Sequence, residues 1–144
     1  TLATIIGDDG AALIGVDTHK ATPLLDAAYN DAAGVTAAFN LNVLRRLNEL
    51  LEADFDEESF RHHAFYNEDR RRVEMHLVSE AEQRVRVPGR DLEFAPGETI
   101  HTECSYKYSL ADFTKLAASA GLAIRHTWMD AERLFSVHFL TREL

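Results

Sequence analysis

The segment Val73-Glu-Met-His-Leu-Val78 decides the fold of the middle of the chain, because apolar and polar side chains alternate along it. This period is typical of a β-strand that buries one face, so we expect Val73, Met75 and Leu77 to point into a core. Stretches of similar character lie at 61–66, 85–87, 91–94 and 99–106, with turn residues between them. The middle of the chain is therefore predicted to be a small, mostly antiparallel meander.

Helical periodicity precedes these strands. One helix is expected to begin with Thr22 as its N-cap and Pro23 in its first turn, and to stop near Gly34. A second helix is expected from about Thr36 to no further than Asp54, because apolar residues recur there at intervals of three and four. Each of these helices should bury one face.

The same periodicity returns after the meander. Ser109 is a favourable N-cap, Asp112 completes a pair similar to a capping box, and Gly121 is the expected stop of a third helix. Two closing strands are predicted at 123–129 and 134–140. This helix and strand pair would follow the strands of the meander directly.

The first residues predict a different environment. Residues 2–6 resemble the last turns of a helix that begins upstream, so we expect the chain to be part of a longer protein. Ala11 to Val16 is almost entirely apolar, which suits a buried strand of the parallel type. The strand ends at Asp17, and open α/β sheets bind ligands at such carboxyl ends. An exposed edge on this strand would favour self-association.

The overall prediction is an α+β or α/β arrangement. Residues 1–20 and 107–144 are interpreted as pieces of one α/β sheet, and residues 21–106 as a lobe inserted into it. The length of 144 residues suits one domain.

Composition excludes several classes of protein. The formal net charge of -9 opposes binding to nucleic acid. Neither a membrane-spanning run nor a signal peptide is recognisable in the sequence. Cys104 is the single cysteine, so an internal disulfide is impossible and a cytoplasmic location is expected.

The segment Thr99-Ile-His-Thr-Glu-Cys-Ser-Tyr-Lys-Tyr108 is the most informative for chemistry. Strand alternation predicts that His101, Glu103 and Ser105 share one face and that Cys104 lies on the other. A carboxylate and a hydroxyl at this spacing form a polar clamp that can fix both nitrogens of an imidazole. The alternative from spacing alone is an ordinary solvent-facing strand. Met75 and Tyr29 also have ordinary structural explanations. Met75 can simply fill the core, and Tyr29 can be a half-buried residue of a helix.

A metal site is not expected from the spacing of the histidines. His62 and His63 are adjacent and point to opposite faces of a strand, whereas His76 and His101 lie on separate strands that could approach each other. A nucleophilic pair of Cys104 with His101 is disfavoured, because alternation separates them. The sequence also contains no glycine-rich phosphate loop.

Four blocks give the chain a family resemblance. They are Ala28-Tyr-Asn-Asp-Ala-Ala-Gly-Val-Thr-Ala-Ala-Phe-Asn40, Val73-Glu-Met-His-Leu77, Ile100-His-Thr-Glu-Cys-Ser-Tyr-Lys-Tyr108 and Arg133-Leu-Phe-Ser-Val-His138. In order and spacing they resemble the histidine-specific methyltransferase family, which includes the L-histidine Nα-methyltransferases of ergothioneine biosynthesis. The resemblance extends over essentially the whole chain.

The resemblance implies a fold, a cofactor and a substrate. The family combines a Rossmann-like domain that binds S-adenosylmethionine with a substrate lobe inserted before its last elements. It implies that Glu103 and Ser105 hold the imidazole of histidine, that Met75 lines the pocket, and that Tyr29 binds the carboxylate of the substrate. The donor-binding residues would precede Thr1, so the chain alone is expected to bind S-adenosylmethionine weakly and to be inactive.

Two other functions remain open at this stage. The chain could be a small-molecule binding module that lost catalysis. It could also belong to a methyltransferase for another aromatic amino acid or an indole, although Glu103 and Ser105 favour an imidazole.

Overall fold

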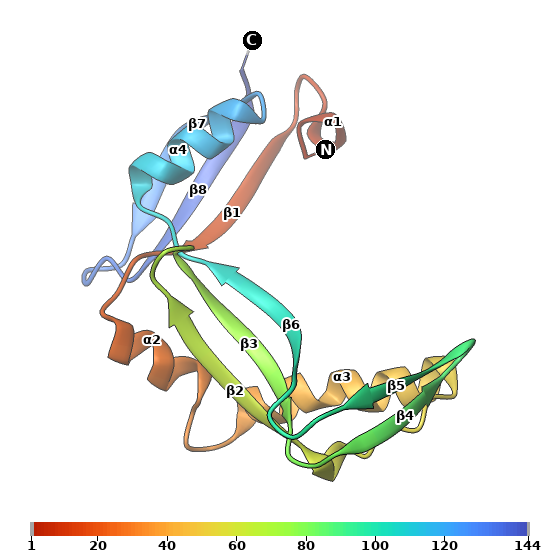
Figure 1. The fold of residues 1–144 in the computed structure, drawn as a ribbon. Coiled ribbons are helices and arrows are strands. Elements are labelled where there is room, and N and C mark those ends of the chain that lie inside the picture. The colour runs from red at the N-terminus through yellow and green to blue at the C-terminus, as the bar shows by residue number, and fades with distance from the viewer. Residues whose placement is uncertain (1, 144) are drawn as a thin grey trace. The chain divides into compact units, whose positions relative to one another are not determined.

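The computed structural model describes residues 2–143, which form a mixed α+β structure with four α-helices and eight antiparallel strands among them (Figure 1). The chain divides into two compact units. One contains the residues up to Lys20 together with those from Tyr106 onward, and the other contains Ala21–Ser105. Within residues 2–143, no helix combines the length and apolar character needed to cross a membrane.

The first unit is a three-stranded sheet with a helix on one face. Its strands are β1 (Ala11–Asp17), β7 (Leu122–Met129) and β8 (Phe135–Arg142), in the order β1-β8-β7. Helix α4 (Leu110–Ser119) packs on the sheet, and the short α1 (Leu2–Ile6) precedes β1. The core between sheet and helix contains Val16, Phe113, Ala117, Leu122 and Leu140.

Strand β1 differs from the sequence-based expectation. It was expected to be buried and of the parallel type, but it pairs antiparallel with β8, and of its residues only Val16 is buried. The physical reason is that α4 covers only one face of a sheet in which β1 is an edge strand. Side chains that point to the other face stay outside, and Leu13 is 66% exposed. The apolar composition of β1 therefore did not correctly predict how deeply the strand is buried.

The predicted ends of α4 are confirmed. The Ser109 hydroxyl accepts a hydrogen bond from the Asp112 N–H at 3.1 Å, which satisfies one of the free amides at the helix start. Gly121 follows the helix with a φ of 71°, a left-handed conformation that glycine adopts without strain.

The second unit contains two helices, a three-stranded sheet and a hairpin. The elements are α2 (Thr22–Tyr29), α3 (Val35–Leu51), the 3-10 turn η1 (Glu57–Ser59), β2 (Phe60–Asn67), β3 (Arg72–Ser79), β4 (Gln83–Val87), β5 (Arg90–Phe94) and β6 (Thr99–Tyr106). The sheet order is β2-β3-β6, whereas β4 and β5 pair only with each other. The predicted single meander is therefore wrong: the chain leaves the sheet after β3, forms a separate hairpin, and returns as β6.

The starts of both helices differ from the predicted capping. Thr22 is the first residue of α2 and not its N-cap; its hydroxyl donates to Glu68 Oε1 at 2.7 Å. Before α3, the Asp31 carboxylate accepts the N–H groups of Val35 at 2.9 Å and Thr36 at 2.8 Å. Hydrogen bonds from the side chain and backbone of Thr36 and from the Val35 amide lower the pKa of Asp31 to about 2.

Both helices pack on the same face of the second sheet. Helix α2 contributes Leu25 to a cluster with Ala64, Val73 and Met75. Helix α3 contributes Leu44 to a second cluster that contains Phe55, Phe60, Leu77, Val85 and Phe94. Met75 and Leu77 are two residues apart on β3 and therefore share this face, as the alternation of the segment predicted.

Candidate functional site

Three of the four predicted site residues lie close together at the end of helix α2. Tyr29, the last residue of α2, donates its phenolic hydrogen to Ser105 Oγ on β6 at 2.8 Å. Its ring packs against the cluster that contains Met75, which is only 3% exposed. The structure therefore combines a tyrosine hydroxyl, a serine hydroxyl and a thioether in one place, on residues far apart in the sequence.

The end of α2 is fixed by polar contacts with β2. The Asn30 side-chain amide donates to the Ala64 carbonyl at 2.9 Å and accepts the Ala64 N–H at 3.1 Å. The Tyr66 N–H donates to Asp26 Oδ1 at 2.8 Å. These bonds hold the turn of helix that carries Tyr29, so its phenol has a defined position. Asp26 and Asn30 are neighbours of Tyr29 whose contacts with β2 spacing alone did not identify.

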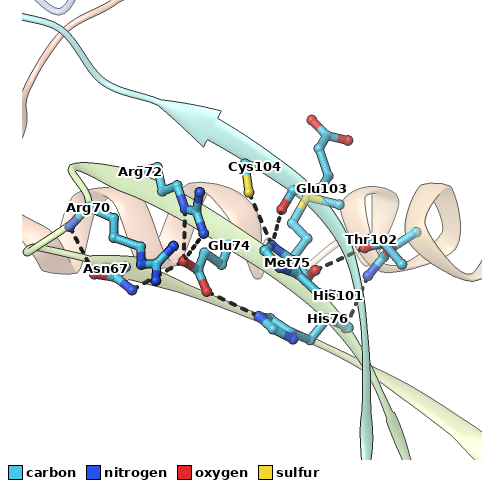
Figure 2. Close-up of polar contacts among 11 residues, drawn as sticks. Asn67, Arg70, Arg72, Glu74, Met75, His76, His101, Thr102, Glu103 and Cys104 are labelled. Carbon is cyan, nitrogen blue, oxygen red and sulfur yellow. Dashed lines mark hydrogen bonds and ion pairs between the residues drawn. The ribbon is translucent and has the colours of Figure 1, made fainter.

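Glu103 does not join this group. Its side chain is exposed, and Figure 2 shows the carboxylate pointing away from His76 and His101. Its backbone carbonyl, in contrast, lies 3.1 Å from His101 Nε2. The predicted pair of Glu103 and Ser105 is therefore not preformed as a clamp in this structure.

Strand β6 breaks its alternation near Glu103. The Thr102 hydroxyl donates to Asn40 Oδ1 on α3 at 2.6 Å, and Ser105 bonds to Tyr29 on α2, although residues three apart should point to opposite faces. On the other face, Cys104 Sγ lies 3.2 Å from His101 Nε2. The predicted grouping of His101 with Ser105, and of Cys104 opposite His101, is wrong, because Ser105 contacts α2 whereas Cys104 contacts His101. Composition does not reveal such a break.

Asn40 is a buried polar residue that the sequence analysis missed. It is 1% exposed, and its amide nitrogen lies 3.1 Å from the His76 carbonyl and 2.9 Å from His62 Nδ1. His62 Nε2 in turn lies 2.8 Å from the Tyr29 carbonyl. One amide thus connects α3 with all three strands of the sheet. An asparagine in the apolar stripe of a predicted helix was the available signal.

The opposite face of the sheet carries a cluster of ionisable groups. Glu74 is 7% exposed; its Oε1 accepts from Arg72 at 2.8 Å, and its Oε2 lies 3.4 Å from His76 Nε2 (Figure 2). The hydrogen bond from Arg72 lowers the pKa of Glu74 despite its burial. Burial lowers the pKa of His76, which favours its neutral form. Glu74 and His76 thus face each other between the charged Arg72 and the ring of His101.

In the first unit, the polar end of β1 is occupied by lysines of the chain itself. Lys107 is 2% exposed and its Nζ lies 2.8 Å from Asp17 Oδ2, while Lys20 contacts Oδ1. Burial acts to raise the pKa of Asp17, but the hydrogen bonds from the two lysines outweigh it and lower this pKa. The carboxylate predicted at a ligand-binding edge is therefore internally neutralised.

Comparison with known proteins gives the chain relatives over its whole length. It is 44% identical over 144 residues to the histidine N-alpha-methyltransferase of Mycolicibacterium smegmatis, covering 99% of this chain and 45% of that protein. It is 41% identical over 131 residues to the protein of the same name from Mycobacterium tuberculosis, covering 90% of this chain and 41% of the relative. The chain therefore spans less than half the length of these relatives.

A more distant relative has a different substrate in its name. The L-tryptophan methyltransferase of Psilocybe serbica is 31% identical over 120 residues, which are 82% of this chain and 34% of that protein. The family described as histidine-specific methyltransferase, SAM-dependent, matches residues 1–142. This match includes the elements that carry Tyr29, Met75, Glu103 and Ser105. The chain belongs to the histidine-specific, S-adenosylmethionine-dependent methyltransferase family.

Proposed function

We propose that this chain is the substrate-binding part of an enzyme that transfers a methyl group from S-adenosylmethionine to the α-amino nitrogen of L-histidine. The observation that supports this most directly is the hydrogen bond between Tyr29 and Ser105 beside buried Met75. The family resemblance implies that these residues contact the amino-acid substrate. In this proposal Tyr29 binds the carboxylate, and Ser105 and Glu103 bind the imidazole.

The chemistry of the pocket accounts for selectivity towards histidine. An imidazole offers one donor and one acceptor nitrogen, which a carboxylate and a hydroxyl can satisfy together. An amino acid without these nitrogens leaves the polar groups unpaired, and that loss disfavours its binding strongly. Glu103 is exposed, so its side chain can rotate towards an imidazole without breaking a packed core. Its carboxylate would then determine which ring nitrogen carries the proton.

The main contribution that the reaction requires from the substrate lobe is alignment of the reacting atoms. The lone pair of a neutral amine attacks the sulfonium methyl, the carbon–sulfur bond breaks, and the amine afterwards loses one proton. Such a step depends mainly on holding nitrogen, carbon and sulfur in line. A carboxylate held by Tyr29 and an imidazole held by Ser105 would fix the amino group from two sides. Positioning is therefore the catalytic contribution we assign to these residues.

The first unit has a separate role in the proposal. We assign its antiparallel strands β1, β8 and β7, with α4, to the end of a Rossmann-like methyltransferase sheet. The order β1-β8-β7 and the single covered face support this assignment. The donor would bind to the part of the protein that corresponds to the remainder of the mycobacterial relatives.

The proposal is tested in a protein that contains both this chain and the donor-binding part. Glu103→Ala should raise KM for histidine by about 10- to 100-fold, which corresponds to losing a hydrogen bond to a charged group. KM for S-adenosylmethionine should stay unchanged. Glu93→Ala, on exposed β5 of the same unit, is the matched control. Unchanged histidine kinetics in Glu103→Ala would remove Glu103 from the site.

A second candidate substrate is tryptophan or another aromatic amino acid, which the Psilocybe relative favours. An indole N–H donates but has no acceptor nitrogen, so it satisfies only one member of the predicted clamp. Methyl transfer measured with histidine and tryptophan in competition distinguishes the two. Preference for tryptophan would overturn the histidine assignment while leaving the methyltransferase assignment intact. Histidine binding without any methyl transfer by the longer protein would instead indicate a binding module.

A further inference from the structure

The outer face of the second sheet gathers metal-binding side chains from different strands. Glu74 and His76 lie on β3 and His101 lies on β6, and their ligand atoms all fall within 4.8 Å of one another. Cys104 Sγ is 3.2 Å from His101 Nε2 (Figure 2). None of these four side chains was assigned to the substrate pocket, which lies on the helix-covered face. From this arrangement we propose a binding site for a borderline divalent cation of the zinc type, formed by Glu74, His76 and His101, with the neighbouring Cys104 moving in to supply the fourth ligand.

The spacing of the donor atoms matches the requirement of such an ion. Zinc binds nitrogen at about 2.0–2.1 Å and thiolate sulfur at about 2.3 Å in a tetrahedron, so neighbouring ligand atoms lie roughly 3.3–3.6 Å apart. Glu74 Oε2 and His76 Nε2 are 3.4 Å apart, and Cys104 Sγ and His101 Nε2 are 3.2 Å apart. Each of these two pairs therefore already has the spacing of neighbouring ligands, and Cys104 would move towards Glu74 and His76 to complete the set.

The donor set selects the class of metal. Imidazole and thiolate ligands favour zinc and similar ions over magnesium or calcium, which prefer oxygen. One carboxylate and one thiolate contribute two negative charges, which balance a divalent cation. His76 Nδ1 is buried without a hydrogen-bond partner among the described residues, while its Nε2 faces Glu74.

Hydrogen bonds already hold the Glu74 carboxylate in the way in which a metal-binding carboxylate is commonly held. Its Oε1 accepts from Arg72 Nε at 2.8 Å and from Asn67 Nδ2 at 3.2 Å, which leaves Oε2 directed at His76. Carboxylates that bind metals are commonly fixed by such outer hydrogen bonds. The positive charge of Arg72 weakens affinity for a cation, and we accordingly expect a site weaker than a structural zinc finger.

Binding requires a local movement of the rings. His76 and His101 are stacked with centroids 4.5 Å apart and planes inclined by 11°, so their nitrogen lone pairs do not converge on one point. His101 is exposed and can turn out of the stack, giving up its contact with the Glu103 carbonyl. The break in alternation of β6 makes the site possible, because regular alternation would direct Cys104 to the other face.

Cobalt(II) is the probe that tests the proposal, since its colour reports both geometry and sulfur ligation. Added to the reduced chain in equimolar amount, it should give the intense visible bands of a four-coordinate ion and a thiolate charge-transfer band. Cys104→Ser should abolish the charge-transfer band, and His101→Ala should abolish both signals. Zinc should displace the cobalt. Both variants change residues outside the buried core, and circular dichroism verifies their folding.

A matched control separates this site from adventitious histidine binding. His63 lies on the same sheet face and stacks on Phe65, but it is outside the ligand group. His63→Ala should leave the cobalt spectrum unchanged. An absent spectrum for the unaltered chain, or an identical spectrum in His101→Ala, overturns the proposal. Histidine methylation by the longer protein is measured in a separate assay. A loss of methylation is therefore distinguishable from a failure to bind the metal ion.

Discussion

Asn40 is the residue whose buried side-chain amide connects α3 to all three strands of the second unit's sheet. It is almost completely buried and bonds to the His76 carbonyl, the His62 ring and the Thr102 hydroxyl. Asn40→Ala removes these three bonds from a largely buried environment, and each group left unsatisfied costs about 1–3 kcal/mol, although the Thr102 hydroxyl keeps its bond to the Met75 carbonyl. We expect a loss of about 2–4 kcal/mol in the free energy of unfolding, measured by urea denaturation.

The matched control for this prediction is Asn42→Ala. Asn42 lies on the same helix but is exposed, so the substitution should change the free energy of unfolding by less than about 0.5 kcal/mol. Equal effects of the two substitutions would show that the helix tolerates loss of the buried amide. In that case α3 would not be held to the sheet through Asn40.

Residue patterns predicted some neighbours in the candidate site and missed others for a physical reason. Met75 is buried on the face that alternation indicated, because β3 is regular over its whole length. Ser105 and Cys104 have partners other than those predicted, because their side chains contact Tyr29 and His101 in place of the neighbours that strict alternation indicates. The contact between Tyr29 and Ser105 joins residues 76 positions apart, and no local pattern encodes such a distance.

At the scale of elements, the central strand β8 carries a histidine whose protonation the fold opposes. His138 is fully buried; its Nδ1 lies 3.0 Å from Thr127 Oγ1 and its Nε2 lies 2.9 Å from Ser136 Oγ. Burial lowers its pKa below the ordinary value of 6.5. Since the unfolded chain takes up this proton more readily, the stabilisation is complete above about pH 6.5 and is lost progressively as the pH falls below it.

We therefore expect the first unit to unfold at lower urea concentration at pH 5.5 than at pH 7.5. One such group contributes up to about 1.4 kcal/mol for each pH unit below its unfolded pKa. Trp128 on β7 is the single tryptophan, so its fluorescence reports on this unit. His138→Gln should reduce the pH dependence, whereas His126→Gln, at an exposed position on β7, should retain it. A pH dependence that survives in His138→Gln would contradict this explanation.

The ends of a helix were predicted correctly from the sequence where interactions within one helical turn determine them. The cap at Ser109 and the glycine after α4 act within one helical turn, and both predictions are confirmed. The start of α2 and the separation of β4 and β5 from the main sheet depend instead on contacts with distant residues, such as that of Thr22 with Glu68. Periodicity identifies that a strand exists, but it does not identify the strand with which it pairs.

At the scale of the whole molecule, the first unit exposes an apolar sheet face opposite α4. Leu13 is 66% exposed, Trp128 50% and Phe135 47%, and the Phe135 ring lies over Gly15. Sedimentation analysis should show an average mass that rises above 16.2 kDa with concentration, as chains associate through this face and the edge of β1. Leu13→Lys should shift the mass towards that of one chain.

A similarly exposed apolar residue on the other unit provides the comparison. Val35 is 68% exposed, and Val35→Lys should leave the concentration dependence unchanged. Suppression of association by both substitutions alike would indicate a general effect of charge rather than a specific face. A constant mass of one chain at every concentration would contradict association through the sheet.

Binding of the methyl donor is the remaining property of the whole molecule that the structure helps to predict. The family is S-adenosylmethionine-dependent, but Gly7 and Gly10 precede β1 instead of following a strand, and Asp17 is neutralised by Lys107 and Lys20. The chain also spans only 45% and 41% of its two mycobacterial relatives. We therefore expect calorimetry to detect weak or no binding of S-adenosylmethionine to the 144-residue chain. A protein that also contains the counterpart of the remaining part of those relatives should bind the donor. Micromolar affinity of the chain alone would show that a donor site exists within these residues and would refute the division of roles proposed for the two parts.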